Sequence, residues 1–256
     1  MKSDVLYGDL AEWYDRLYYS KERTAKEINF INKLLIKHKC KKLLEISAGS
    51  GRLTIPLKKL GHDIVGVDIS KEMIALAKIK AKKEGLKIPF FVQSMEKTNV
   101  PGKPFDCVML PCSSPLYLTD NGFAIETLKR CNAHLKKGGI LFFDVQNFWR
   151  IILSGRIIKK EPAMSGGNWK MSLLHNYVIS QIKGELRDDQ TLICYIGKKK
   201  LPPVKRDILF RIYNLNEIDL LFRLTGFKIV EAYSDYKFHK LSEENNKRYI
   251  LIAKKI

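Results

Sequence analysis

The sequence predicts an α/β fold with a doubly wound, mostly parallel sheet. Between about residues 40 and 149, apolar runs typical of buried strands alternate with amphipathic stretches typical of helices, which indicates a parallel sheet. From about residue 150 to residue 213 the pattern becomes a strict alternation of apolar and polar residues, which predicts a small antiparallel β insertion. A length of 256 residues favours one large domain carrying that insertion over two equal domains.

A loop of small residues follows the first predicted strand. The apolar run at 43–46 leads into Ser47-Ala48-Gly49-Ser50-Gly51, after which 53–60 has the pattern of a helix. Glycine in such a loop lets the backbone approach a ligand closely, because glycine has no Cβ. The first turn of the helix then offers unpaired N–H groups and the positive end of its dipole to an anionic group. The loop is therefore a predicted binding site.

Asp68 directly follows the second predicted strand, 64–67. It lies roughly 20 residues beyond the loop, which is the offset of a carboxylate that holds ribose hydroxyls. The loop and Asp68 together predict a site for an adenosine-containing cofactor. A dinucleotide fingerprint needs a third glycine, and Thr54 stands at that position, so NAD is a weaker alternative. An ordinary strand–helix turn without a ligand is the other alternative.

The remaining elements of the sheet follow in order. Ser70 is expected to cap a helix that ends at Gly85. The next elements are strands at 89–93 and 105–110, a helix at about 120–135 and a strand at 140–145. Ligands of parallel sheets lie at the carboxyl ends of the strands. Four residues are expected to gather at that edge: Ser47, Asp68, Ser94 and Leu110.

The last part of the chain predicts antiparallel strands around one helix. Period-two patterns predict the inserted strands, and a helical pattern followed by two apolar runs closes the chain. The predicted elements are strands at 169–179, 191–196 and 204–213, a helix at 215–225, and strands at 227–233 and 249–253.

The acid and the small-x-Gly-x-Gly pattern from Glu45 to Gly51 resemble motif I of the class I S-adenosylmethionine-dependent methyltransferases. Phe105-Asp106 before an apolar strand, and Leu135 to Gly139 before the last parallel strand, are similar to the same family. The resemblance implies a seven-stranded Rossmann-like sheet with an antiparallel C-terminal strand pair, and S-adenosyl-L-methionine as the cofactor. The chain departs from the family at Ser47, where glycine is usual.

The resemblance also implies the roles of the segments. Residues 1–39 are expected to form an N-terminal helical lid segment, and 40–149 with 214–256 the cofactor-binding Rossmann-like domain. Residues 150–213 are expected to form an antiparallel substrate roof, similar to glycine N-methyltransferase-like enzymes of small molecules.

The cofactor-binding residues are carried over by position from the family motifs. Ser94 stands where relatives often have an acid for the adenine amino group, so serine or backbone contacts are expected there. Met95 is expected on the adenine ring, with plain core packing as the alternative. The expected cofactor-binding residues of the domain are Glu45, Ser47, Ala48, Gly49, Gly51, Arg52, Asp68, Ile69, Met73, Ser94, Met95 and Leu110.

The segment Trp13 to Tyr19 resembles the Tyr-Asp-x-x-Tyr stretch of the same relatives, whose aromatic residues close over the cofactor. Tyr14 and Tyr18 are therefore further cofactor-binding candidates, because tyrosine rings and hydroxyls stabilise a sulfonium cation. The alternative is an aromatic helix face packed on the core.

The sequence does not identify a catalytic residue. His175 on a predicted roof strand and Tyr117 after the strand 105–110 are weak candidates, and a lone histidine in such a strand is more often structural. The five cysteines show no C-x-x-C pair and no histidine at zinc-ligand spacing, so no metal is expected.

These observations predict an S-adenosylmethionine-dependent methyltransferase acting on N or O of a small-molecule acceptor. A formal net charge of +19 leaves an RNA or protein methyltransferase as the less favoured alternative, since charge runs are mostly solvated faces. A non-enzymatic protein with the same fold is the third. No apolar run approaches the length of a membrane span and no signal peptide is seen, so a cytoplasmic location is expected.

Overall fold

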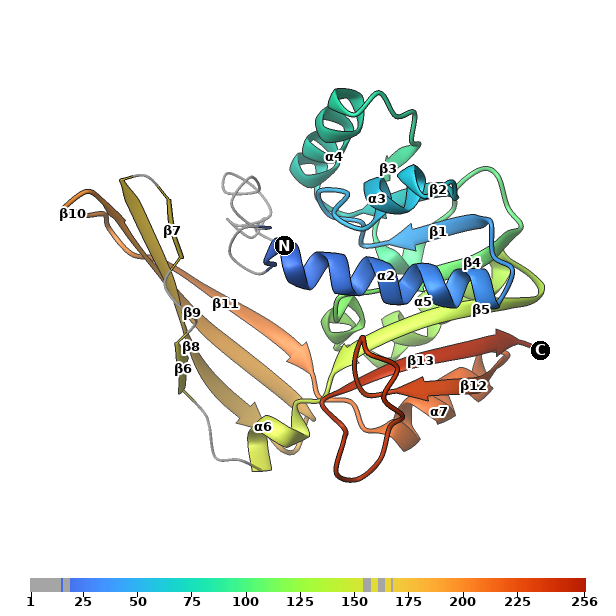
Figure 1. The fold of residues 1–256 in the computed structure, drawn as a ribbon. Coiled ribbons are helices and arrows are strands. Elements are labelled where there is room, and N and C mark those ends of the chain that lie inside the picture. Colours follow the sequence, from blue (N-terminus) through green and yellow to red (C-terminus); the bar gives the residue numbers. More distant parts are fainter. Residues whose placement is uncertain (1–14, 16–18, 154–157, 161–163, 167) are drawn as a thin grey trace. The chain divides into compact units, whose positions relative to one another are not determined.

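The computed structural model describes Asp15 and residues 19–153, 158–160, 164–166 and 168–256. The chain divides into two compact units. The first unit comprises Met1–Pro115, Asp120–Gln146 and Leu215–Ile256, and the second comprises Leu116–Thr119 and Asn147–Asn214. Figure 1 labels the elements of both units.

A seven-stranded sheet forms the centre of the first unit, in the order β12-β13-β5-β4-β1-β2-β3. Strands β1 to β5 run parallel, whereas β13 pairs antiparallel with both β5 and β12. The predicted doubly wound sheet with its antiparallel C-terminal pair is thus confirmed. The strands are β1 (Lys42–Ile46), β2 (Asp63–Asp68), β3 (Phe90–Val92), β4 (Phe105–Leu110), β5 (Leu135–Gln146), β12 (Phe227–Tyr233) and β13 (Arg248–Lys255).

Helices cover both faces of this sheet (Figure 1). They are α2 (Lys21–Lys37), α3 (Thr54–Lys59), α4 (Lys71–Lys83), α5 (Asn121–His134) and α7 (Leu215–Leu224), with short 3-10 turns η1 (Met95–Lys97) and η2 (Ser114–Tyr117). Adjacent residues of a strand point to opposite faces. Phe142 of β5 belongs to the buried cluster that includes Phe30 of α2 and Leu57 of α3. The ring of Phe143 instead meets Phe222 of α7 edge-on, at 5.2 Å between ring centres.

Two predicted helix starts are confirmed by their caps. The Ser70 hydroxyl accepts a hydrogen bond from the Met73 N–H at 3.0 Å at the start of α4. The Asp120 carboxylate accepts one from the Phe123 N–H at 3.0 Å at the start of α5. Each cap satisfies one of the backbone donors that a helix leaves unpaired at its first turn.

Strand β5 begins earlier than the sequence predicts. The Lys-Lys-Gly-Gly stretch after α5 was expected to separate helix from strand, but β5 already starts at Leu135, which pairs with Phe105 of β4. The register shifts between Phe105 and Cys107, and Gly138 has a left-handed φ of 71°. The glycine lets the strand absorb the irregularity, so the Lys-Lys-Gly-Gly stretch lies inside the strand.

The second unit contains a six-stranded antiparallel sheet, which confirms the predicted β insertion. Its elements are α6 (Trp149–Leu153), β6 (Ile158–Lys160), β7 (Met164–Gly166), β8 (Trp169–Ser180), β9 (Glu185–Ile196), β10 (Lys199–Lys200) and β11 (Val204–Arg211). Strand β9 begins at Glu185 rather than at Thr191, because it pairs with β8 along its whole length. The polar residues Asp188, Asp189 and Gln190 interrupt the alternation of apolar and polar residues, so the sequence pattern does not predict the first part of this strand. Within the described residues, no helix combines the length and the apolar content needed to span a membrane.

Candidate functional site

The glycine loop between β1 and α3 is built from left-handed residues. Ser47, Gly49 and Gly51 have φ values of 67°, 54° and 79°. Glycine adopts this conformation without steric cost, whereas a residue with a Cβ does not. The structure thus gives the reason why glycine is usual at the position that Ser47 occupies. The loop closes on itself through a hydrogen bond from the Gly51 N–H to the Ala48 carbonyl at 3.0 Å.

Asp68 at the end of β2 fastens this loop. One carboxylate oxygen accepts a hydrogen bond from the Gly49 N–H at 2.8 Å, and the other accepts one from the Ser70 N–H at 2.9 Å. Burial raises the pKa of Asp68, and the bonds from Ser70 and Gly49 oppose that shift. The predicted pairing of the loop with Asp68 is therefore a direct contact between the ends of β1 and β2.

Gly49 and Gly51 differ in what surrounds them. A Cβ built on Gly49 would meet no heavy atom of the described residues within 4 Å, whereas one on Gly51 would lie 3.0 Å from Ile55 Cδ1 and 3.4 Å from Ala77 Cβ. A side chain at position 51 would therefore press on α3 and α4, and the left-handed φ of 79° favours glycine there as well. Among the described residues, none occupies the space over Gly49, which leaves room for a ligand.

Glu45 lies near the end of β1 and is 2% exposed. It accepts a hydrogen bond from the hydroxyl of Thr54, which is itself fully buried, at 2.5 Å. Burial raises the pKa of Glu45 to about 7, against the opposing effects of Thr54 and Arg52. Thr54, the residue in place of a third fingerprint glycine, therefore supports the motif I acid.

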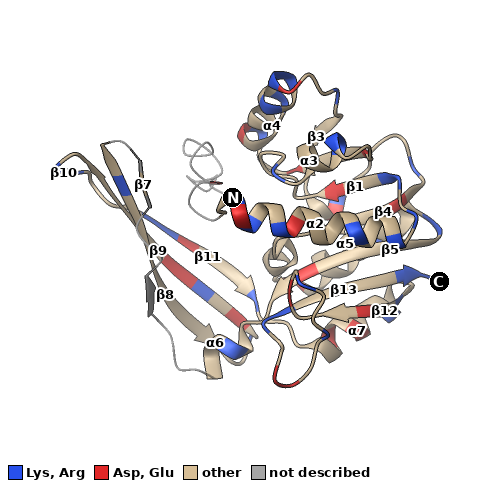
Figure 2. Ribbon diagram, in the orientation of Figure 1, with Lys and Arg blue, Asp and Glu red and all other residues tan. Residues whose placement is uncertain are grey.

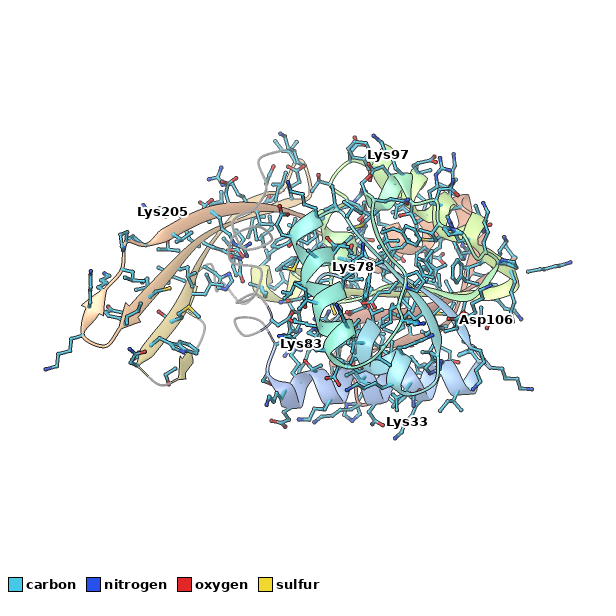
Figure 3. All side chains as sticks on the ribbon, turned by 90° about the horizontal axis from the view of Figure 1, so that it is seen from above. Lys33, Lys78, Lys83, Lys97, Asp106 and Lys205 are labelled. Atoms are coloured by element: carbon cyan, nitrogen blue, oxygen red, sulfur yellow. The ribbon has the colours of Figure 1, made fainter. Side chains whose placement is uncertain are left out.

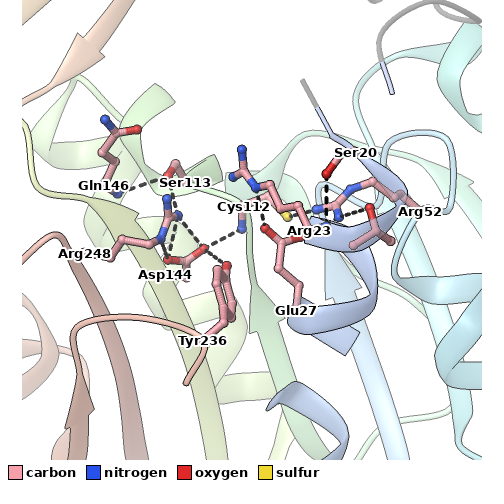
Figure 4. A network of polar contacts seen from close by, with 11 residues as sticks. Ser20, Arg23, Glu27, Arg52, Cys112, Ser113, Asp144, Gln146, Tyr236 and Arg248 are labelled. Carbon is pink, nitrogen blue, oxygen red and sulfur yellow. Dashed lines mark hydrogen bonds and ion pairs between the residues drawn. The ribbon is translucent and has the colours of Figure 1, made fainter. Parts of the chain in front are cut away.

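Arg52 at the end of the loop forms an ion pair with Glu27 of α2, which the sequence analysis missed. Arg52 Nη1 lies 2.5 Å from Glu27 Oε2, and their side chains are 11% and 1% exposed. Figure 4 shows Arg52 beside Glu27. The Arg52 guanidinium also lies over the Tyr19 ring, 3.6 Å from its centre. A signal existed, because Glu27 falls on the buried stripe of α2 with Phe30, Ile31 and other apolar residues.

A second polar cluster, also missed, lies at the end of β5. Asp144 is fully buried and forms an ion pair with Arg248 of β13 at 2.7 Å. The Asp144 carboxylate also accepts hydrogen bonds from the Tyr236 hydroxyl at 2.6 Å and the Cys112 N–H at 2.9 Å. The only indication of this cluster in the sequence was Asp144 itself, an acid in an otherwise apolar predicted strand.

The other predicted cofactor residues of the first unit differ in exposure. Ile69 is 64% exposed, whereas Met73 and Leu110 are fully buried and present no side-chain surface. Ser94 and Met95 are half-buried, and the Ser94 hydroxyl donates to Glu96 at 2.7 Å. Ala48 is buried beside the loop.

Tyr14 and Tyr18 lie outside the described residues. Between them, Asp15 is described: its carboxylate accepts a hydrogen bond from the Ser50 hydroxyl at 2.5 Å and pairs with Lys80 of α4 at 2.8 Å. The chain before α2 therefore contacts the glycine loop at this residue.

The weak catalytic candidates lie in the second unit. His175 of β8 is buried, and its Nδ1 lies 2.8 Å from Asp188 Oδ2 of β9. Gln190 also donates to that oxygen, at 2.5 Å. Tyr117 is 38% exposed and meets Phe210 of β11 edge-on at 5.2 Å. His175 thus has the carboxylate partner that orients an imidazole base.

Comparison with known proteins gives consistent likenesses. Residues 43–139 match the methyltransferase domain family. A protein of Geobacillus sp. (strain WCH70) that bears the name methyltransferase is 29% identical over 262 residues, 98% of this chain and 100% of its own. The glycine/sarcosine N-methyltransferase of Aphanothece halophytica is 25% identical over 258 residues, 99% of this chain and 91% of its own. The crystal structure of an S-adenosylmethionine-dependent methyltransferase from Clostridium acetobutylicum ATCC 824 has a TM-score of 0.81 at 20% identity, covering 97% of this chain and 98% of that one.

The fold, the glycine loop with its aspartate, and these likenesses agree with one another. Residues 43–139 match the methyltransferase domain family, and the chain has the fold of a solved S-adenosylmethionine-dependent methyltransferase. The family match begins in β1 and ends in β5, so it includes the loop and Asp68. The narrower expectation of a glycine N-methyltransferase-like branch stays a prediction.

Proposed function

We propose that this protein transfers a methyl group from S-adenosyl-L-methionine to a nitrogen or oxygen atom of a small-molecule acceptor. The contact between Gly49 and Asp68 carries the proposal, because it joins the open loop to the carboxylate expected to hold the ribose.

The residues of the loop fit that cofactor. The open space over Gly49 accommodates its methionine part, and Asp68 offers an acceptor to the ribose hydroxyls. Ile69, exposed beside Asp68, is the apolar candidate for the adenosine, with Ser94 and Met95 as the candidates at the adenine. When bound, the cofactor supplies an activated methyl group. The protein must then position the acceptor and exclude water.

Two observations favour a small acceptor over a polyanion. Lys and Arg are spread along α2, α4 and the ends of the strands of the first unit rather than gathered in one stripe (Figure 2). Lys33 of α2, Lys78 of α4 and Lys97 of η1 likewise emerge from three separate elements (Figure 3). The inserted sheet and the likeness to a glycine/sarcosine methyltransferase add support.

Calorimetric titration with S-adenosylmethionine, S-adenosylhomocysteine and NAD tests the cofactor. We expect affinities on the order of micromolar for the first two and no binding of NAD. Binding of neither methionine derivative would contradict the proposal. Release of S-adenosylhomocysteine is then measured with a panel of small amines, acids, alcohols and phenols, and an RNA sample serves as the comparison. Turnover with RNA alone would favour the alternative acceptor.

A further inference from the structure

The turn directly after β4 holds two consecutive left-handed residues. Cys112 and Ser113 have φ values of 58° and 63°, and neither is glycine. This conformation costs free energy, because the Cβ atom approaches the following carbonyl oxygen. Such strain persists only where the surrounding structure holds it, and it gathers at functional sites.

Asp144 and Arg248 hold the turn from one side (Figure 4). The Asp144 carboxylate accepts the Cys112 N–H at 2.9 Å, and the Asp144 backbone carbonyl accepts the Ser113 N–H at 3.0 Å. Arg248 donates to both carboxylate oxygens of Asp144 and to the Ser113 hydroxyl, each at 2.8 Å. Burial raises the pKa of Tyr236 well above its ordinary value, so its phenol stays protonated and donates to Asp144.

Arg52 of the glycine loop contacts the turn on its other side. Arg52 Nη2 contacts Cys112 Sγ, and Arg52 Nη1 donates a hydrogen bond to Glu27. Burial raises the pKa of the Cys112 thiol to about 12, against the opposing effect of Arg52, so the thiol is a neutral partner. Figure 4 shows Cys112 between Asp144 and Arg52. The strained turn therefore links the end of β5 to the glycine loop.

We propose that Arg248 is a positioning residue for the cofactor: it fixes Cys112 through Asp144 and thereby fixes Arg52 in the glycine loop. This inference rests on the proposed function, since it takes the loop as the binding site of S-adenosylmethionine. The role requires the planar fork of arginine, which engages Asp144 and Ser113 together. Lysine keeps the charge but offers a single point of contact.

A double-variant cycle tests the coupling. Full-length Arg248→Lys, Cys112→Ala and the double variant are titrated calorimetrically with S-adenosylhomocysteine. Arg223→Lys is the matched control, because Arg223 forms an exposed ion pair with Asp219 one turn away on α7. We expect each single variant to weaken binding by about tenfold, and the double variant to bind within roughly twofold of Cys112→Ala. The control should bind like the wild-type protein.

Two results would overturn the inference. One is an affinity of Arg248→Lys within roughly twofold of wild type; the other is losses that multiply in the double variant, as independent structural effects do. Absence of binding by the wild-type protein is a different result, which overturns the proposed function as well.

Tyr236→Phe provides a second route should Arg248→Lys fail to fold. It removes one hydrogen bond to Asp144 and leaves the ion pair with Arg248 in place. As a single substitution, Tyr236→Phe should weaken the affinity for S-adenosylhomocysteine by about threefold. Combined with Cys112→Ala, it should cause no further loss of affinity. Unchanged affinity in the wild-type background contradicts the inference.

Discussion

The Asp68 carboxylate accepts a hydrogen bond from the Gly49 N–H at 2.8 Å, across 19 positions of sequence. The end of β2 thereby sets the position of the loop that follows β1. Because Asp68 also accepts the Ser70 N–H, one carboxylate holds both the glycine loop and the start of α4.

Asp68→Ala should remove both a ribose partner and the tie to the loop. We expect it to weaken S-adenosylhomocysteine binding by roughly 1.5–3 kcal/mol, the range for a hydrogen bond to a charged group. Asp63→Ala is the matched control, since Asp63 lies exposed at the opposite end of β2. Calorimetric titration of both variants checks the prediction. Equal affinities would mean that the ribose lies elsewhere.

Gly49 and Gly85 allow conformational strain to be separated from ligand contact. Both have positive φ, 54° and 68°, and a Cβ on either would meet no atom within 4 Å in the part of the chain that the structure describes. Substitution by alanine should therefore destabilise both variants similarly, by about 1–2 kcal/mol. Only Gly49→Ala should lose affinity for S-adenosylhomocysteine. Urea unfolding and calorimetry measure the two effects, and a matching loss of affinity in Gly85→Ala would refute the assignment of the loop.

Glu27→Gln should strongly destabilise the fold. The substitution leaves the Arg52 guanidinium, whose side chain is 11% exposed, without its carboxylate partner. Removing one member of a buried ion pair typically costs about 3–5 kcal/mol. Glu22→Gln is the control on the same helix, because its pair with Lys26 is exposed to solvent. A urea midpoint of Glu27→Gln close to that of Glu22→Gln would show that the pair contributes little.

Glu45 should make stability depend on pH. Burial raises its pKa from the ordinary 4.5 to about 7, so the folded state retains a proton that the unfolded state has lost between these two values. Stability should therefore fall as pH rises from about 4.5 to 7, by on the order of 3 kcal/mol from this group.

In Glu45→Gln, residue 45 has no titratable proton. As pH rises through the same window, the free energy of unfolding of this variant should therefore increase relative to that of the wild-type protein. Urea unfolding at pH 5 and pH 8 measures the difference. Glu84→Gln, at an exposed position after α4, should follow the wild-type curve. Parallel curves for Glu45→Gln and the wild type would contradict the shifted pKa.

Local patterns were sufficient for most of the fold. The cap at Ser70, the helix start near Asp120 and strand β12 lie where the sequence predicts them. The predictions were weaker where pairing partners decide the element. Glu185 to Gln190 carry polar residues yet belong to β9, because β8 and β11 flank them on both sides.

The site divides in the same way. Ser47, Gly49, Gly51 and Asp68 follow from spacing along the chain, since a strand–loop–helix unit and the next strand set their relation locally. The resemblance to motif I adds the expectation of S-adenosylmethionine as the cofactor. Arg52 was predicted as a cofactor residue, but its pairing with Glu27 has no local cause.

By itself, the sequence determined the doubly wound sheet, the antiparallel insertion and the order of loop and aspartate, because periodicity and turn residues act over short distances. Only the tertiary structure decided which buried charges meet. Glu27 joins Arg52 across 25 positions and Asp144 joins Arg248 across 104. A buried charge requires an opposite partner, but any part of the chain that the fold brings near can supply it.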